Sequence, residues 1–292
     1  MVVQHNLQAM NSNRQLNINT ATQAKSTEKL SSGYKINRAA DDAAGLAISE
    51  KMRRQVRGLT QASANAQDGI SMAQTAEGAL NEVHDMLQRI NELAVKGENG
   101  TLTSKDRSYI ASEVQQLMSE VDRVASTSTF NEMKLLAGTE GVGSGELKVG
   151  LQVGAEADQH ITVTIKAMNV SGVYGSGADA VKAFYSGAIV ASAFDGDTGM
   201  SAFQNLNKDT KKALEAVSQQ RSDLGAVQNR LEHTIKNLDN IVENTTSAES
   251  AIRDTDMATE MVKYANNNIL AQAGQSMLAQ ANQSNQGVLS LL

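Results

Sequence analysis

The chain has 292 residues and a formal net charge of −6, with 40% hydrophobic but only 3% aromatic residues and no Trp, Pro or Cys. The absence of Cys excludes disulfides, thiolate zinc sites and Cys nucleophiles. The acidic balance, without a dense Lys or Arg run, argues against a nucleic-acid partner. A core poor in aromatic rings, in a chain without the helix-ending Pro, is typical of long coiled coils.

Residues 1–32 predict only a weak helix. Its apolar positions, Leu7 and Met10 among them, are sparse and stand among many Asn and Gln. So thin a stripe does not stabilise an isolated helix in water. We therefore expect this segment to become ordered only against a partner.

Residues 46–97 predict a much stronger helix. From Met52 onward, apolar and small residues recur at spacings of three and four, which places them on one stripe, as in a coiled coil. At about 1.5 Å per residue, such a helix would be roughly 78 Å long. The expected stop is the segment from Gly97 to Gly100.

A second strong helix is predicted over residues 104–127. Thr103 is a suitable N-cap, and Asp106, three residues later, completes an imperfect capping box. The predicted heptad seam steps by four and three through Ile110, Val114, Leu117, Val121 and Val124.

The middle of the chain changes character. Residues 147–153 and 161–165 alternate apolar and polar side chains, which predicts two strands joined by a hairpin at residues 154–159. From 168 to 199 the pattern fades into Gly, Ser and Ala, and the sequence predicts no definite structure there.

Residues 205–247 predict a third long helix, and residues 256–292 a weak one like that at the N-terminus. The seam of the long helix contains Leu214, Val217, Arg221, Leu224, Gln228, Leu231, Ile235, Leu238 and Val242. Arg221 and Gln228 interrupt it, and such polar residues commonly fix the register of a coiled coil. The fold class is therefore mainly α: a long antiparallel coiled-coil bundle formed by both termini, with a small β-hairpin region in the middle.

Four segments of the chain resemble the bacterial flagellin family. They read NRAADDAAGLAIS (37–49), INELAV (90–95), RSDLGAVQNRL (221–231) and NILAQAGQSMLAQAN (268–282). Long ungapped segments in the same order make a specific resemblance, and it covers roughly 1–165 and 200–292. The resemblance implies a structural subunit that assembles into the flagellar filament, and not an enzyme.

The resemblance also implies a domain organisation. An inner domain, D0, would comprise residues 1–33 and 256–292, with Leu7, Met10, Leu270, Met277, Leu278 and Leu292 as its assembly residues. Residues 34–45 and 248–255 would be connecting spokes. A helical domain with the hairpin, D1, would comprise residues 46–167 and 200–247. The short segment 168–199 would stand in place of large outer domains.

The start of the chain does not read as a secretory signal peptide, and no apolar run approaches the roughly 18 residues of a membrane span. These features alone would indicate a cytoplasmic protein. The resemblance instead implies export through the flagellar type III channel, without a cleaved signal peptide, to the extracellular filament. The implied partners are other copies of the chain, an export chaperone, and the filament cap and hook-junction proteins.

Two sets of candidate residues follow from the resemblance. Arg89, Leu93 and Glu113 match positions through which flagellins pack in filaments and bind the animal flagellin-sensing Toll-like receptor. Arg89 and Leu93 are four apart on one helix face, and Glu113 should lie nearby on the next helix. Arg38, Asp41 and Asp42 belong to the N-terminal signature, where a salt-bridged spoke is favoured over acid–base chemistry because no nucleophile accompanies them.

No catalytic, cofactor or metal site is predicted, since the four His residues show no metal-ligand spacing. Two alternatives to a filament subunit remain. A hook–filament junction protein would share the terminal architecture without growing long homopolymers. A type III translocator or secreted coiled-coil effector would remain monomeric or bind a different partner.

Overall fold

A computed structural model of the chain describes residues 6–138, 145–175, 181, 184 and 196–289. They fall into two compact units, one of residues 1–57 with 241–292 and one of residues 58–240. The fold is mainly helical with small antiparallel sheets, as predicted. Among the described helices, none is both long enough and apolar enough to pass through a membrane.

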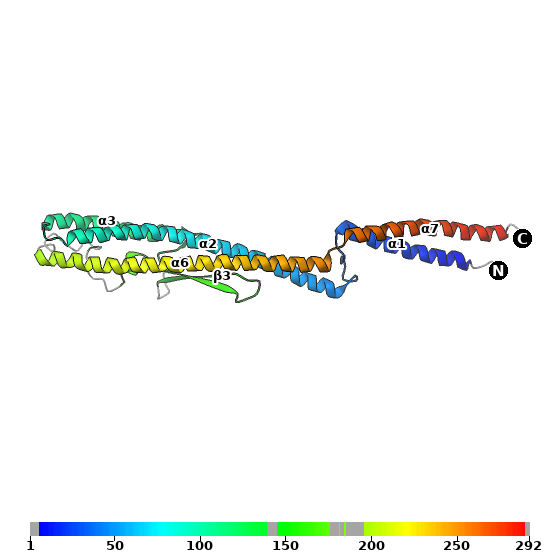
Figure 1. Cartoon of the computed structure of the whole chain (residues 1–292), viewed down its shortest axis with the longest axis horizontal. Coiled ribbons are helices and arrows are strands. Elements are labelled where there is room, and N and C mark those ends of the chain that lie inside the picture. Colours follow the sequence, from blue (N-terminus) through cyan, green and yellow to red (C-terminus); the bar gives the residue numbers. More distant parts are fainter. Residues whose placement is uncertain (1–5, 139–144, 176–180, 182–183, 185–195, 290–292) are drawn as a thin grey trace. The chain divides into compact units, whose positions relative to one another are not determined.

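The unit of residues 58–240 is built on three helices that run alongside one another (Figure 1). They are α2 (Ala43–Gly97), α3 (Ser104–Thr127) and α6 (Gly196–Arg253). Their core contains fully buried aliphatic side chains from each helix, including Leu80, Leu87, Val114, Val217 and Leu224. This core uses the apolar stripes that the sequence predicts, so hydrophobic burial holds the three helices together.

The helix ends follow local capping chemistry. The Thr103 side chain accepts a hydrogen bond from the backbone of Asp106 (3.3 Å), and the Asp106 carboxylate accepts one from the Thr103 backbone (3.1 Å), which confirms the predicted capping box. α2 begins at Ala43 rather than 46, because the Asp42 carboxylate accepts the Gly45 N–H at 2.9 Å and caps the first turn. α6 extends beyond the predicted 205–247 at both ends.

The buried face of α3 is shifted from the predicted seam. Met118 and Ala125 are fully buried, whereas Leu117 and Val124 are only partly buried. A helix packed against neighbours on more than one side buries a wider stripe than a strict two-position heptad seam. The predicted positions Ile110, Val114 and Val121 are buried as expected.

The predicted hairpin is present as β3 (Glu146–Gln152) and β4 (His160–Lys166), paired antiparallel with Val149 opposite Val163. Side chains from both long helices hold it. Asn65 on α2 donates to the Gln152 carbonyl at 3.1 Å, and Gln220 on α6 donates to the Thr164 carbonyl at 3.0 Å. The remaining short elements are β1 (Thr129–Phe130), β2 (Met133–Lys134) and α4 (Val170–Tyr174). Most of residues 168–199 lies outside the described residues.

In the other unit, α1 (Leu7–Ser32) and α7 (Met257–Leu289) lie side by side (Figure 1). Among the side chains that the structure describes on these helices, their packing buries only Ser26 on α1 and Glu260 and Ala281 on α7. Asn6 caps α1 by accepting the Ala9 N–H at 3.0 Å, and it donates to the Ala281 carbonyl at 3.0 Å. The sparse apolar stripes of the two ends thus produce a helix pair with very little core.

Candidate assembly surface

Large apolar side chains are exposed along both terminal helices. Between 45 and 71% of the surface of each is accessible for Leu7, Met10, Ile18, Met257, Met261, Val262, Ile269, Leu270 and Met277. Soluble monomers rarely present so many apolar side chains on one helix pair, and such surfaces mark sites of interaction. Of the other predicted assembly residues, Leu278 is half-buried and Leu292 lies outside the described residues.

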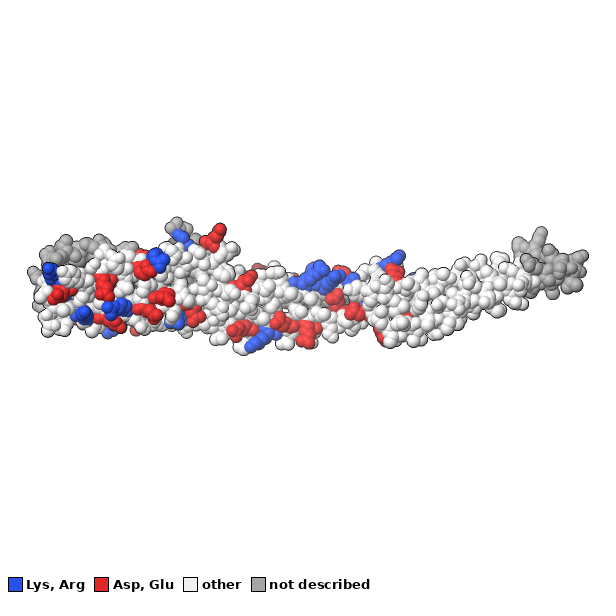
Figure 2. Space-filling model, turned by 90° about the horizontal axis from the view of Figure 1, so that it is seen from above, with Lys and Arg blue, Asp and Glu red and all other residues white. Residues whose placement is uncertain are grey.

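The same helices carry few charges. From Tyr264 to Leu292 the sequence has no Lys, Arg, Asp or Glu, and in residues 1–24 Arg14 is the only one of these. Figure 2 shows a surface almost without red or blue atoms over much of α1 and α7, whereas charges are dense over α2, α3 and α6. The polar character of the terminal helices comes from Asn, Gln and Ser instead.

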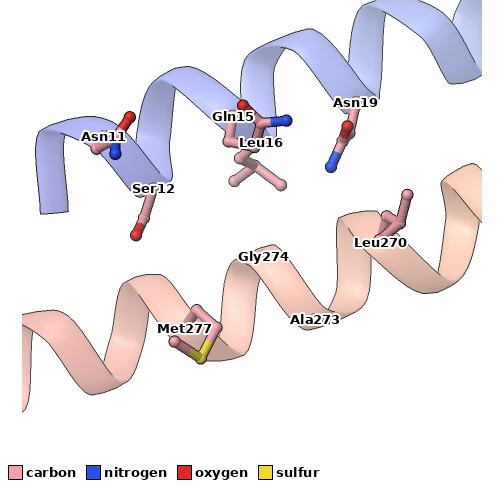
Figure 3. Close-up of a pocket in the computed structure, with 9 residues that line it drawn as sticks. All are labelled: Asn11, Ser12, Gln15, Leu16, Asn19, Leu270, Ala273, Gly274 and Met277. Carbon is pink, nitrogen blue, oxygen red and sulfur yellow. The ribbon is translucent and has the colours of Figure 1, made fainter. Parts of the chain in front are cut away.

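A groove of about 450 Å³ lies between α1 and α7. Leu16 points from α1 toward Gly274, where a Cβ would lie 3.4 Å from the Leu16 Cδ1 atom (Figure 3). Leu270 and Met277 line the groove from α7. The walls of the groove are therefore partly apolar, and the groove has room for a side chain from outside this helix pair.

Near the base of this helix pair, Glu260 is 7% exposed. Burial raises the pKa of its carboxyl group, but hydrogen bonds from Ser26 and Lys263, with the nearby charges of Lys263 and Lys29, lower it more. The net pKa is therefore below its ordinary value. The carboxylate is therefore charged. Because it accepts a hydrogen bond from Ser26 on α1, it joins α7 to α1.

The segments that follow α1 and precede α7 pair with each other. Tyr34 and Asp254 form an antiparallel bridge, with the Lys35 N–H donating to the Arg253 carbonyl at 2.7 Å. The Arg253 guanidinium lies 4.7 Å from the centre of the Tyr34 ring and 2.8 Å from the Glu50 carboxylate. The sequence did not identify Arg253 in this role, because a lone Arg between two helices has no diagnostic spacing.

The three residues of the predicted spoke signature contact different partners. Arg38 forms its ion pair with Glu28 at 2.9 Å rather than with either aspartate. Asp41 accepts hydrogen bonds from the backbone of Arg38 (3.0 Å) and Asn37 (3.2 Å), and these bonds lower its pKa. Asp42 caps α2. Both aspartates thus accept hydrogen bonds from nearby backbone N–H groups and stabilise turns. These local bonds take the place of an ion pair with the exposed Arg38.

Arg89 and Glu113 meet as expected, and Leu93 does not join them on the surface. The Arg89 guanidinium lies 2.9 Å from the Glu113 carboxylate, and hydrogen bonds from Arg89 to Glu113 and Glu92 raise the Arg89 pKa. Leu93 is only 2% exposed, because its side chain packs in the core of the helical unit. Leu93 is therefore a core residue of the monomer, and its part in a packing or receptor-binding surface stays a prediction.

Arg107 is a structural residue that sequence analysis missed. It is 4% exposed, and its guanidinium donates to the carbonyls of Gly97 (3.2 Å) and Asn99 (3.2 Å) at the end of α2. Those carbonyls lack helical partners, so the buried cation satisfies them and complements the helix dipole. Arg107 lies seven residues before Val114, on the same seam, and this spacing was the signal that could have predicted its burial.

The polar interruptions in the α6 seam share one partner. Gln228 donates to the Glu77 carboxylate at 3.1 Å, and an Arg221 guanidinium nitrogen lies 4.0 Å from it. A slip of one helical turn between α2 and α6 would break both contacts. This arrangement is consistent with polar seam residues that fix register. The described residues hold no group of three His, Asp or Glu placed to bind a metal.

Comparison with known proteins gives matches along nearly the whole chain. Residues 3–141 match the family model described as the bacterial flagellin N-terminal helical region, and residues 208–292 match the bacterial flagellin C-terminal helical region. A flagellin from Halalkalibacterium halodurans is 50% identical over 292 residues, covering 100% of both chains. The flagellar filament 31.3 kDa core protein of Treponema maltophilum is 49% identical over 296 residues, with 100% of both chains covered.

A solved structure described as a flagellar hook-associated protein from Vibrio parahaemolyticus is similar in fold. Its TM-score is 0.60 at 13% sequence identity, and the match covers 73% of this chain and 100% of that one. So low an identity shows a shared fold alone, whereas the curated relatives match in sequence from end to end.

Proposed function

This chain belongs to the bacterial flagellin family, and on that premise we propose that α1 and α7 carry its assembly into the filament. As a flagellin it is a structural subunit of the extracellular flagellar filament and not an enzyme. The observation that carries the proposal is the set of exposed apolar side chains on both terminal helices, in a helix pair that buries little of its own surface.

Packing between copies would supply the core that the helix pair lacks. Apolar surface removed from water contributes about 25 cal/mol per Å², so each buried Leu or Met contributes on the order of 1.5–3 kcal/mol. Without that gain, helices with so few buried contacts are marginal. The ends therefore gain most of their helical stability as a subunit enters the filament.

The domain organisation is part of this proposal. Residues 1–33 and 256–292 form D0, residues 34–45 and 248–255 the spokes, and residues 46–167 and 200–247 D1, with 168–199 in place of outer domains. The scarcity of charge and the exposed apolar side chains of α1 and α7 support a separate D0.

Seeded polymerisation tests the assembly role. Purified monomer is mixed with short filament fragments and followed by light scattering and electron microscopy, beside a chain lacking residues 256–292. Circular dichroism confirms that the truncated chain retains its long helices. The intact chain is expected to elongate the seeds and the truncated chain not to do so. Elongation by a folded truncated chain would contradict the role of α7.

We propose further partners on the same basis. The chain leaves the cell through the flagellar type III channel without a cleaved signal peptide, with an export chaperone on its C-terminal segment, and contacts cap and hook-junction proteins in the flagellum. The sparse apolar stripe of α7 supports this proposal, because a segment with so little core of its own is available to bind a chaperone before assembly. Calorimetric titration of the flagellin export chaperone should give binding to the intact chain and none to the chain lacking 256–292.

We also propose that the monomer binds the animal flagellin-sensing Toll-like receptor through Arg89 and Glu113. Both side chains are about half exposed and paired, so they present one charged, hydrogen-bonding patch. Leu93 would support this patch from the core. Arg89→Ala should weaken receptor binding by roughly tenfold or more, measured by surface plasmon resonance. Arg123→Ala, at an exposed ion pair on α3, is the matched control.

A further inference from the structure

The most exposed methionines among the described residues lie on the two terminal helices. The chain has 12 Met and no Cys. Four Met on the terminal helices are 45 to 62% exposed, namely Met10, Met257, Met261 and Met277. In the unit of residues 58–240, Met72, Met118 and Met168 are at most 2% exposed. Met133 on β2 is the exposed exception in that unit, at 40%. Among the described residues, the four most accessible thioethers therefore lie on the surface to which the assembly role is assigned.

Thioethers are the side chains that a peroxide oxidises when no thiol competes. The sulfur attacks one peroxide oxygen, the O–O bond breaks, and the sulfur loses two electrons. One oxygen remains on the sulfur as the sulfoxide and the other leaves as water. Exposure decides which Met reacts first, so the four exposed thioethers should react well before the three buried ones.

We propose that Met10, Met257, Met261 and Met277 form a peroxide-sensitive modification site that decides whether a monomer can enter the filament. The inference rests on the proposed role of α1 and α7 in assembly. A hydrogen peroxide-class oxidant would act on the monomer, before packing between copies covers these side chains.

The surroundings of these residues explain why oxidation matters. Met277 lines the groove between α1 and α7, as Leu270 and Leu16 also do (Figure 3). Met10 and Ile18 both line a second groove along α1. A sulfoxide is polar and accepts hydrogen bonds, so its burial between copies without a donor weakens association by roughly tenfold per group.

The first test needs no substitution. Full-length monomer is partly oxidised with hydrogen peroxide, freed of oxidant, and added to filament seeds, and the filaments are then sedimented. Peptide mass spectrometry measures the sulfoxide fraction at each Met in pellet and supernatant. Sulfoxide at the four exposed positions should be enriched in the supernatant by roughly tenfold. Equal fractions in pellet and supernatant would overturn the proposal.

A variant test compares each protein with its own untreated sample. The chain carrying M10L, M257L, M261L and M277L should have the same critical concentration before and after peroxide, whereas that of the parent should rise at least about tenfold. The control M72L, M118L and M168L should remain as sensitive as the parent. A sensitive fourfold variant would contradict the assignment, and if that variant does not polymerise, the partition experiment decides.

Reversal distinguishes sulfoxide formation from other damage. A methionine sulfoxide reductase fed by a dithiol returns the sulfoxide to the thioether, releasing water and oxidising the dithiol to a disulfide. Treated monomer should then elongate seeds as before, and persistent loss would count against the proposal. Failure of untreated parent monomer to elongate seeds would instead refute the assembly role itself.

Discussion

Arg107 shows how one buried cation secures the turn between α2 and α3. Arg107→Met keeps the length of the side chain but removes the donors to the Gly97 and Asn99 carbonyls. The Asn99 carbonyl would keep the Leu102 N–H as a donor at 3.3 Å, but the Gly97 carbonyl would lose the donor from Arg107. This loss should lower the free energy of unfolding by about 1–3 kcal/mol. Urea denaturation followed by circular dichroism measures the change.

Arg123→Met is the matched control for Arg107. Arg123 is an exposed residue of α3 that pairs with Glu120 three positions earlier. Exposed pairs of this kind contribute at most about 1 kcal/mol. Equal destabilisation by the two substitutions would show that the carbonyl contacts of Arg107 contribute nothing beyond an ordinary surface charge.

Glu260 gives the terminal helices a dependence on pH. Its pKa in the folded chain is below the ordinary value of 4.5, so its stabilising contribution is complete above that pH. The contribution is lost as the pH falls from there through the lowered pKa. Amide protection in α1 and α7 should therefore decrease on acidification below about 4.5, as measured by hydrogen exchange.

Glu260→Gln should reduce that acid dependence, because the amide does not titrate. Its protection should be lower than that of the parent at neutral pH and should change less on acidification. Asp256 also has a lowered pKa, from its hydrogen bonds with Thr259, so some dependence remains. An unaltered acid profile in the variant would rule out Glu260 as the titrating group.

The C-terminal end of α2 is packed too closely for any side chain at Gly97. A Cβ there would lie 2.5 Å from Cδ1 and 2.6 Å from Cγ of Phe203, which is fully buried. An aromatic ring held at 5.2 Å from Phe184 cannot move aside easily. Gly97→Ala should therefore destabilise the chain by about 1–3 kcal/mol, measured by thermal or urea unfolding.

Gly78 in the same helix is the opposite case. A Cβ there would meet no described atom within 4 Å apart from its chain neighbours and the backbone of its own helix. Gly78→Ala should stabilise the chain by up to about 1 kcal/mol through helix propensity. If both substitutions changed stability in the same direction, contact with Phe203 would not be the deciding factor at Gly97.

Elements with a strong local signal could be predicted from the sequence. The capping residues Thr103 and Asp106 and the period-two alternation near Val149 fix where α3 and the hairpin lie. Their chemistry acts within a few residues, so no knowledge of distant contacts is needed. The long stripes likewise predict α2 and α6, although their bounds depend on caps such as Asp42.

Residues whose roles depend on distant partners could not be predicted. Leu93 is buried because neighbouring helices cover it, and periodicity alone does not say which edge of a stripe is covered. Arg253 contacts Glu50 and Tyr34, which are about 200 positions away in sequence. Arg107 satisfies carbonyls across a turn whose geometry the sequence does not specify.

At the scale of the whole molecule, the two units differ in how much core each has. Nearly all buried aliphatic side chains lie in residues 58–240, whereas α1 and α7 bury mainly Ser26, Glu260 and Ala281. Regions with few buried contacts open at low free-energy cost. In the monomer, amides of α1 and α7 should exchange at least about tenfold faster than those around Leu87 and Val114.

Hydrogen exchange with mass spectrometry on monomer and filament checks this expectation. In the filament, the terminal helices should become protected to a level near that of α2 and α3. Equal protection of both units in the monomer would contradict the view that the ends depend on neighbouring copies for their order.

The segment without charges after Tyr264 has a consequence for any polymer of identical subunits. Every copy places the same residue in the same environment, so a charge buried near its own symmetry mates repels them at each step along the polymer. Two like charges 4 Å apart cost about 1 kcal/mol even in water, and that cost is repeated with every added copy. Asn, Gln and Ser keep this part of α7 polar without that repeated repulsion, so copies that pack through it add no such electrostatic cost from its side chains.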